Sequence, residues 1–158
     1  MFFIDRSYHV VPDIAGVIFL IPDPSKEGEF MDSKEFVKHR KNLNKTQKEM
    51  AQLLGVSIKA IHSYEQGWRT VPPHVERQMF FLTARKRSNN KQKPCWRIKK
   101  CPPKQKKECP AWEFQAGKFC WFINGTICCG TAQEKWKEKM ALCRSCEVLA
   151  SLTETEPG

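Results

Sequence analysis

Apolar side chains recur at helical spacing in two short runs between residues 46 and 67. Each run covers one side of a helix, with Met50, Ala51 and Leu54 in the first and Ile61 and Tyr64 in the second. Gly55 separates the runs at a point where a helix must end, because glycine enters the left-handed conformation at little cost. The pattern predicts two short helices joined by a tight turn, which is the arrangement of a DNA-binding helix-turn-helix.

Polar residues mark where these helices begin. Thr46 and Glu49 have the spacing of a capping box, in which each side chain bonds to a free backbone N–H at the helix start. Ser57 is a suitable N-cap for the second helix. An earlier helix is expected to begin at Asp32 or Ser33, which are also residues that cap helices well.

A further helix is predicted from His74 to Arg87, after two prolines that suit a first helical turn. Val75, Met79 and Leu82 give it one strongly apolar side. This is more apolar surface than one small domain needs. It either packs on the first helix through Phe36, or joins two copies into a homodimer whose recognition helices lie about one turn of DNA apart.

Residues 33–87 resemble the XRE-like, or phage-repressor, class of helix-turn-helix domains. The resemblance is carried by Arg40, Gln47, Ala51, Gly55, Ile61 and Glu65-x-Gly67. It implies an ion pair between Arg40 and Glu65 that braces the first helix against the end of the third. A generic helical bundle with a solvated basic face is the alternative.

The same resemblance implies double-stranded DNA as the partner. Base edges in the major groove are expected to meet the first part of the recognition helix, at Ile58, Lys59, His62 and Ser63. Lysine can donate to guanine, and isoleucine can contact the methyl group of thymine. Phosphates are expected to be held by Gln47, Ser57 and Arg69.

The charge balance suits a polyanionic partner. The chain has 27 Lys and Arg against 17 Asp and Glu, a formal charge of +10 and a pI of about 9.3. A basic surface also simply keeps a protein in solution. The stretch from Arg85 to Lys107 holds eleven basic residues and no acidic one, which is typical of a solvated linker and, beside a helix-turn-helix, could also follow phosphates.

Residues 1–30 differ in character from the rest. Their apolar patch, Gly16 to Ile21, has six residues, whereas a membrane helix needs about twenty, and no secretory signal is present. We therefore expect no membrane partner. We interpret residues 1–30 as a non-native extension before a start at Met31, because codons for Lys26-Glu27-Gly28 can contain a bacterial ribosome-binding sequence. The alternative is a genuine N-terminal strand from Ile14 to Ile21.

All eight cysteines follow a polar, turn-rich stretch at residues 88–94, which we interpret as an interdomain linker. The four histidines lie outside this region, so a metal site there would be rich in thiolates, which select zinc or iron–sulfur clusters. A zinc ribbon normally has two Cys-x-x-Cys pairs, but this region has only Cys143-x-x-Cys146. Iron–sulfur ligands can be more widely spaced, and free or reversibly oxidised thiols are a third option.

The best metal-ligand candidates are Cys143 and Cys146, whose spacing suits one metal at a single turn. The site is expected to be completed from Cys101, Cys109, Cys120 and Cys128, with Cys95 as a further candidate. Cys129 is expected to matter least. A secreted disulfide framework is the remaining interpretation, but no export signal is present and a DNA-binding neighbour favours a reducing compartment.

The cysteine region also resembles the two-CW domain of bacterial regulators and sensors, over about residues 95–149. The matching positions are Cys95-Trp96, Cys101-Pro102, Cys109-Pro110, Cys120-Trp121, Gly125-Thr126-x-Cys128, Lys135 and Cys143-x-x-Cys146. This resemblance implies a signal-input or structural module, and it does not identify a ligand.

Together these patterns predict a mainly α protein. A four- to five-helix helix-turn-helix domain at residues 31–87 precedes a small irregular Cys-rich domain at residues 95–149 and a disordered tail at residues 150–158. We expect a cytoplasmic, sequence-specific transcriptional regulator that responds to metal or redox state. No catalytic motif is present, so an enzyme is not expected. The alternative is a metal- or iron–sulfur-carrying adaptor or electron-transfer protein whose helix-turn-helix binds protein.

Overall fold

The computed structural model describes residues 8–12, 18–22, 31–88 and 92–153, which are mainly helical, as predicted. The first two segments are β1 (Tyr8–Pro12) and β2 (Ile18–Pro22), an antiparallel pair. Of the strand considered over Ile14–Ile21, residues 18–21 belong to β2 and residues 14–17 lie outside the described residues. Residues 89–91 of the proposed linker also lie outside them. None of the helices in the described part of the chain has the length and apolar character that a bilayer crossing requires.

Four helices form the N-terminal unit. They are α1 (Ser33–Asn42), α2 (Gln47–Leu54), α3 (Ile58–Glu65) and α4 (Pro73–Arg87). Asp32 caps α1 by accepting a 2.7 Å hydrogen bond from the backbone N–H of Glu35. The capping box of α2 is formed as predicted, and Gly55 ends α2 in the left-handed conformation with φ of 65°. The tight turn between α2 and α3 is therefore built by the residues that the sequence pattern indicated.

Short elements make up the C-terminal half. They are α5 (Cys95–Ile98), α6 (Pro103–Glu108), α7 (Pro110–Glu113), the 3-10 helix η1 (Cys120–Phe122), β3 (Thr126–Cys128), β4 (Thr131–Gln133), α8 (Trp136–Arg144) and α9 (Glu147–Thr153). β3 and β4 form a small antiparallel hairpin in which Ile127 pairs with Ala132. This half has the irregular character that the sequence predicted.

One glycine holds the start of this half in place. The carbonyl of Gly117 accepts a 2.7 Å hydrogen bond from the N–H of Cys95. A Cβ atom at Gly117 would lie 2.5 Å from both the Cβ of Pro94 and the ring of Trp96. A larger residue there would therefore push α5 away from the loop that follows α7.

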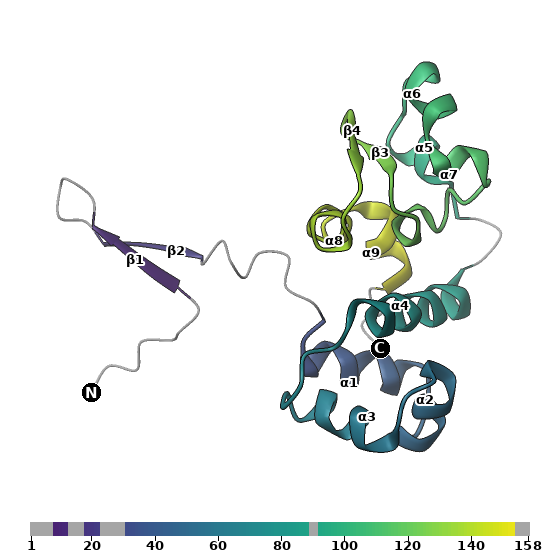
Figure 1. The fold of residues 1–158 in the computed structure, drawn as a ribbon. Coiled ribbons are helices and arrows are strands. Elements are labelled where there is room, and N and C mark those ends of the chain that lie inside the picture. The colour runs from purple at the N-terminus through teal and green to yellow at the C-terminus, as the bar shows by residue number, and fades with distance from the viewer. Residues whose placement is uncertain (1–7, 13–17, 23–30, 89–91, 154–158) are drawn as a thin grey trace.

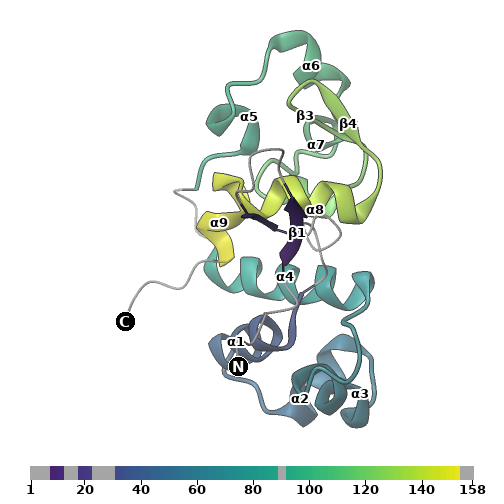
Figure 2. The same cartoon turned by 90° about the vertical axis from the view of Figure 1, so that its left-hand side faces the viewer.

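A large hydrophobic core runs through both halves, and a second, smaller cluster that includes Ala111 and Val148 lies in the C-terminal half. The large core includes Phe36, Ile61, Met79 and Phe80 from the first half and Trp121, Trp136, Met140, Leu149 and Leu152 from the second. Figures 1 and 2 show α4 lying between helices α1–α3 on one side and α8 and α9 on the other. The surplus apolar surface of α4 is thus covered from both sides within one chain, by α1 and by the C-terminal half, and a homodimer stays a prediction.

The boundary predicted at residue 149 is four residues too early. α9 continues to Thr153, and Leu152 is buried in the shared core. Leu149 and Leu152 are three positions apart, so they lie on the same side of α9. Both belong to the shared core. Only residues 154–158 of the predicted tail lie outside the described residues.

Candidate functional site

The predicted base-reading residues lie on the uncovered side of α3. Ile58 is 50% exposed, Lys59 and His62 are exposed, and Ser63 is half-buried. The opposite side of the helix packs into the core through Ala60, Ile61 and Tyr64. The N-terminal part of α3 therefore presents a mixed polar and apolar surface, as a helix that enters a major groove must.

The three predicted phosphate contacts have different surroundings. Ser57 is exposed, although its hydroxyl also accepts a 3.1 Å hydrogen bond from the N–H of Ala60 as the cap of α3. Arg69 is exposed just after α3. The side-chain nitrogen of Gln47 instead donates a 2.8 Å hydrogen bond to Glu65, so a phosphate contact through that nitrogen requires this bond to open.

Arg40 and Glu65 form the ion pair that the resemblance implied. Both guanidinium Nε and Nη2 of Arg40 donate to the carboxylate, the second over 3.1 Å, and Nη1 donates to the carbonyl of Lys45. The side chains of Arg40 and Glu65 are 15% and 7% exposed. Burial alone would raise the pKa of Glu65, but the hydrogen bonds from Arg40 and Gln47 outweigh it and lower the pKa.

Trp68 was not among the DNA contacts predicted from the sequence. It follows α3, is 71% exposed, and packs edge-on against His62 with ring centroids 5.3 Å apart. A large exposed aromatic ring beside the base-reading residues is suited to contact a sugar or a base. No signal in the sequence separates this tryptophan from the buried ones.

The C-terminal half contains a cavity of about 400 Å³ that all eight cysteines line. The structure therefore brings together every candidate metal ligand, and also Cys129, which is exposed. Trp96 and Trp112 contribute to the same wall and contact each other edge-on, with centroids 4.9 Å apart. These two tryptophans thus lie at a cavity, whereas Trp121 and Trp136 are buried in the core.

The thiols differ in how readily they ionise. Burial raises the pKa of Cys101, Cys128 and Cys143, the last to about 11. A hydrogen bond from the Cys120 thiol lowers the pKa of Cys95 and raises that of Cys120 itself. Cysteine thiolates suit zinc and iron, but within the described residues no three His, Cys, Asp or Glu side chains are grouped so that they could hold one metal ion.

Lys139 was not among the cavity residues predicted from the sequence. It is fully buried, and its Nζ donates to the hydroxyl of Thr126, which lines the cavity. Positions 136, 139, 140 and 143 share one side of α8, and all four are buried. That spacing was a usable signal, because it puts a lysine among Trp136, Met140 and Cys143 on an apolar face.

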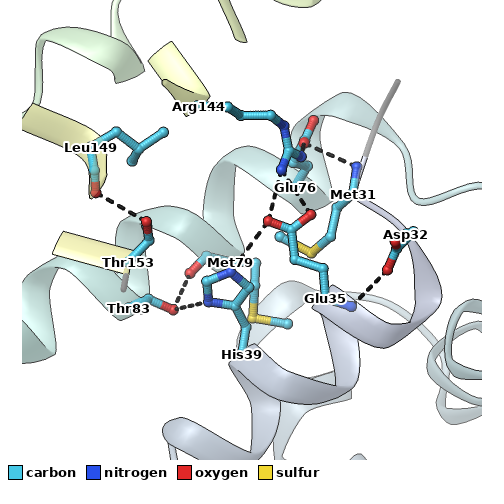
Figure 3. A network of polar contacts seen from close by, with 10 residues as sticks. All are labelled: Met31, Asp32, Glu35, His39, Glu76, Met79, Thr83, Arg144, Leu149 and Thr153. Carbon is cyan, nitrogen blue, oxygen red and sulfur yellow. Dashed lines mark hydrogen bonds and ion pairs between the residues drawn. The ribbon is translucent and has the colours of Figure 1, made fainter. Parts of the chain in front are cut away.

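Arg144 connects the cavity to the N-terminal unit. It directly follows Cys143, and its Nη1 donates to both carboxylate oxygens of Glu35 in α1, each over 2.8 Å. Its Nη2 donates to the buried carboxylate of Glu76 in α4 over 2.5 Å (Figure 3). Burial alone would raise the pKa of Glu35, but hydrogen bonds from His39 and Arg144 outweigh it and lower the pKa.

Glu76 collects three donors from distant parts of the chain. Besides Arg144, the backbone N–H of Met31 donates to it over 3.0 Å and the indole N–H of Trp136 over 2.8 Å. A buried carboxylate is tolerated only when it is paired and hydrogen-bonded, as here. The two halves of the chain are thus joined by a polar network as well as by the apolar core.

Comparison with known proteins supports the first of these two sites. Residues 38–75 match the family model described as Helix-turn-helix, the XRE-family class, and the match contains α2 and α3 completely. At the level of the family, it supports a DNA-binding regulator. The match does not extend into the Cys-rich half, so the resemblance of that half to two-CW domains stays a prediction. No curated protein and no solved structure matches the chain.

Proposed function

We propose that this chain is a transcriptional regulator that inserts the N-terminal part of α3 into the major groove of a specific DNA site. The observation that carries the proposal is the exposed row of Ile58, Lys59 and His62 on a helix whose other side is fixed in the core. The helix-turn-helix match and the net charge of +10 support the same function. The adaptor alternative is not favoured, because that match supports DNA binding.

Within this function the contacts have separate roles. Lys59, Ile58, His62 and Ser63 read base edges, whereas Arg69 and Ser57 hold phosphates. Base contacts create preference for one sequence, and phosphate contacts strengthen binding to all sequences alike.

The test compares Lys59→Ala with Arg69→Ala on the selected site and on random duplex. Lys59→Ala should lose about 1–3 kcal/mol on the selected site only, and Arg69→Ala should weaken both and reduce the salt dependence. Lys135→Ala, at the exposed N-cap position just before α8, is the matched control and should change neither. Equal losses on both DNAs for Lys59→Ala would contradict the base-reading role.

We further propose that metal or thiol oxidation at the cysteine cavity regulates DNA binding in the cytoplasm. The support is positional, since Arg144 lies between Cys143 and Cys146 in the chain and contacts α1 and α4 of the DNA-binding unit. A change in the backbone at this turn would alter those contacts. Regulation requires an element with two arrangements whose equilibrium depends on both the cysteine cavity and the DNA-binding site. The turn at Arg144 is placed to be that element.

The test of regulation measures DNA affinity of the reduced chain before and after treatment with a metal chelator or with hydrogen peroxide. We expect either treatment to change the affinity of the natural chain, and Arg144→Gln to remove the change. Arg97→Gln, at an exposed position of α5, should leave it intact. DNA affinity that is unaffected by chelation and by oxidation would reject a regulatory role for the cavity.

A further inference from the structure

We propose that the cysteine cavity binds a polynuclear iron–sulfur cluster and that the buried ammonium of Lys139 is the counter-ion of this anionic group. The inference rests on the proposed metal response of the C-terminal half and makes it more specific. It names one class of ligand, four ligating thiolates and a positioning residue that no cysteine motif indicates.

The first observation is the burial of Lys139. Its side chain is fully buried in α8, and among the described residues its hydrogen-bond partner is the neutral hydroxyl of Thr126. No carboxylate of the described residues pairs with it. A buried ammonium without an anion is unfavourable, so the site needs negative charge from another source.

The second observation is that two thiols, which become thiolates when they bind iron, lie next to this ammonium. The hydroxyl of Thr126, which Lys139 contacts, lies 3.9 Å from the sulfur of Cys128. Cys143 is one helical turn after Lys139 on the same buried side of α8. The ammonium thus lies beside two thiols that line the cavity, one contributed by β3 and one by α8.

Two further thiols complete a set of four. Cys120 in η1 is buried on the cavity wall, and Cys95 at the start of α5 lines the same cavity. The proposed ligands are therefore Cys95, Cys120, Cys128 and Cys143, which come from four different elements. Three of these, Cys120, Cys128 and Cys143, were also predicted as ligands from the sequence. Cys95, which was only a further candidate there, is now a proposed ligand, whereas Cys146 is not.

The third observation is the arrangement of the thiols around a space. A mononuclear zinc site needs four ligands that meet at one ion, and the described residues contain no such group of even three. A cluster would spread its thiolate ligands over two or more irons, with inorganic sulfide in the space between them. Eight thiols around a cavity of about 400 Å³ suit that geometry better than a single ion.

Charge decides what Lys139 contributes. A cluster held by four thiolates is anionic, and its stability and potential depend on net charge and on hydrogen bonds near the sulfurs. Lys139 and Thr126 together provide one positive charge and a donor chain that reaches Cys128. Trp96, Trp112 and Leu142 make part of the cavity wall apolar.

The experiment uses the full chain purified without oxygen and reconstituted with ferrous iron and sulfide. Iron and acid-labile sulfide are measured per chain, with the visible absorbance spectrum and the melting temperature of the metal-free protein. The natural chain should bind iron and sulfide in equal amounts and become brown. Lys139→Met should retain the cluster about 10- to 100-fold less well, yet melt at a higher temperature without metal, because an unpaired buried charge is gone.

Lys137→Met is the matched control, because it removes a lysine from the exposed side of the same helix. It should change neither loading nor melting. The proposal would be overturned if Lys139→Met bound as much iron and sulfide as the natural chain. It would also be overturned if the natural chain bound metal without sulfide. If Lys139→Met does not fold, Lys139→Gln and the iron-to-sulfide ratio of the natural chain decide the same question.

DNA binding of the natural chain is measured on the same preparation. A natural chain that binds the cluster but shows no specific DNA binding would reject the DNA-binding function alone. A chain that binds DNA but never binds iron and sulfide would reject the cluster alone.

Discussion

Glu65 is the residue at which three elements of the DNA-binding unit meet. Glu65 is the last residue of α3, and its carboxylate accepts hydrogen bonds from Arg40 of α1 and Gln47 of α2. Because Glu65 is 7% exposed, removing it leaves the Arg40 charge without its partner in a largely buried position. Glu65 therefore adds a polar connection from the recognition helix to α1 and α2, besides the core packing of Ala60, Ile61 and Tyr64.

We predict that Glu65→Ala lowers the free energy of unfolding by about 3–5 kcal/mol, as expected when one partner of a shielded pair is removed. Urea unfolding of Glu65→Ala, Arg40→Ala and the double variant measures the coupling between them. The double variant should be less destabilised than the sum of the single ones, by at least about 0.5 kcal/mol. Strictly additive losses would mean that the pair contributes no interaction energy.

This pair could be predicted from the sequence because it belongs to a local motif with fixed spacing. The roles of Arg144 and Lys139 could not be predicted in the same way. Arg144 contacts Glu35 and Glu76, which are 109 and 68 positions away in the chain, so the contact depends on how the two halves pack. The Lys139 position on an apolar helix face was readable, but its neighbours from β3 were not.

At the scale of elements, α4 is a helix with two buried sides. Its Phe80 packs against His39 of α1 and against Trp121 of η1, with ring centroids 5.3 Å and 6.2 Å apart. Its Glu76 binds Trp136 and Arg144 of α8. Caps and turn residues indicated where α1 to α4 begin and where α2 ends, but local signals do not say which element covers a given apolar face.

The contact between α1 and α8 should make folding sensitive to acid. The pKa of Glu35 is lowered from 4.5 in the folded chain, so its stabilising effect is fully present above that pH and is lost as the pH falls through the folded pKa. We predict that Glu35→Gln is less stable than the natural chain at neutral pH, and that this difference shrinks on acidification.

Urea unfolding at a series of pH values from about 6 down to about 3 checks this prediction. Glu138→Gln, at a position 61% exposed on α8, serves as the control and should follow the natural chain throughout. A difference between Glu35→Gln and the natural chain that stays constant over this range would show that the charge of Glu35 is not responsible.

At the scale of the whole molecule, the two halves share one hydrophobic core. The sequence predicted two domains because composition changes sharply near residue 88 and all cysteines follow it. Composition reports what each segment contains but not which surfaces it covers. The shared core became visible only when Trp121, Leu149 and Leu152 were placed against α4.

We therefore predict that a fragment ending at Ser88 is less stable than the full chain. Removal of the C-terminal half uncovers Phe80 and leaves Glu76 without two of its donors, which should cost at least about 2 kcal/mol. Urea unfolding compares the two proteins, and sedimentation shows whether the uncovered face associates. A monomeric fragment as stable as the full chain would contradict the shared core.

The covered face of α4 has a consequence for synthesis of the chain. A ribosome releases the N-terminal half first, so α1 to α4 leave the exit tunnel before α8 and α9 exist to cover them. During that interval Phe80 and its neighbours form an exposed hydrophobic surface that chaperones or other nascent chains can bind. Substitutions that delay folding of the Cys-rich half should thus lower the yield of protein through aggregation, even where the folded protein still binds DNA normally. Centrifugation of newly synthesised chains would detect the aggregated fraction.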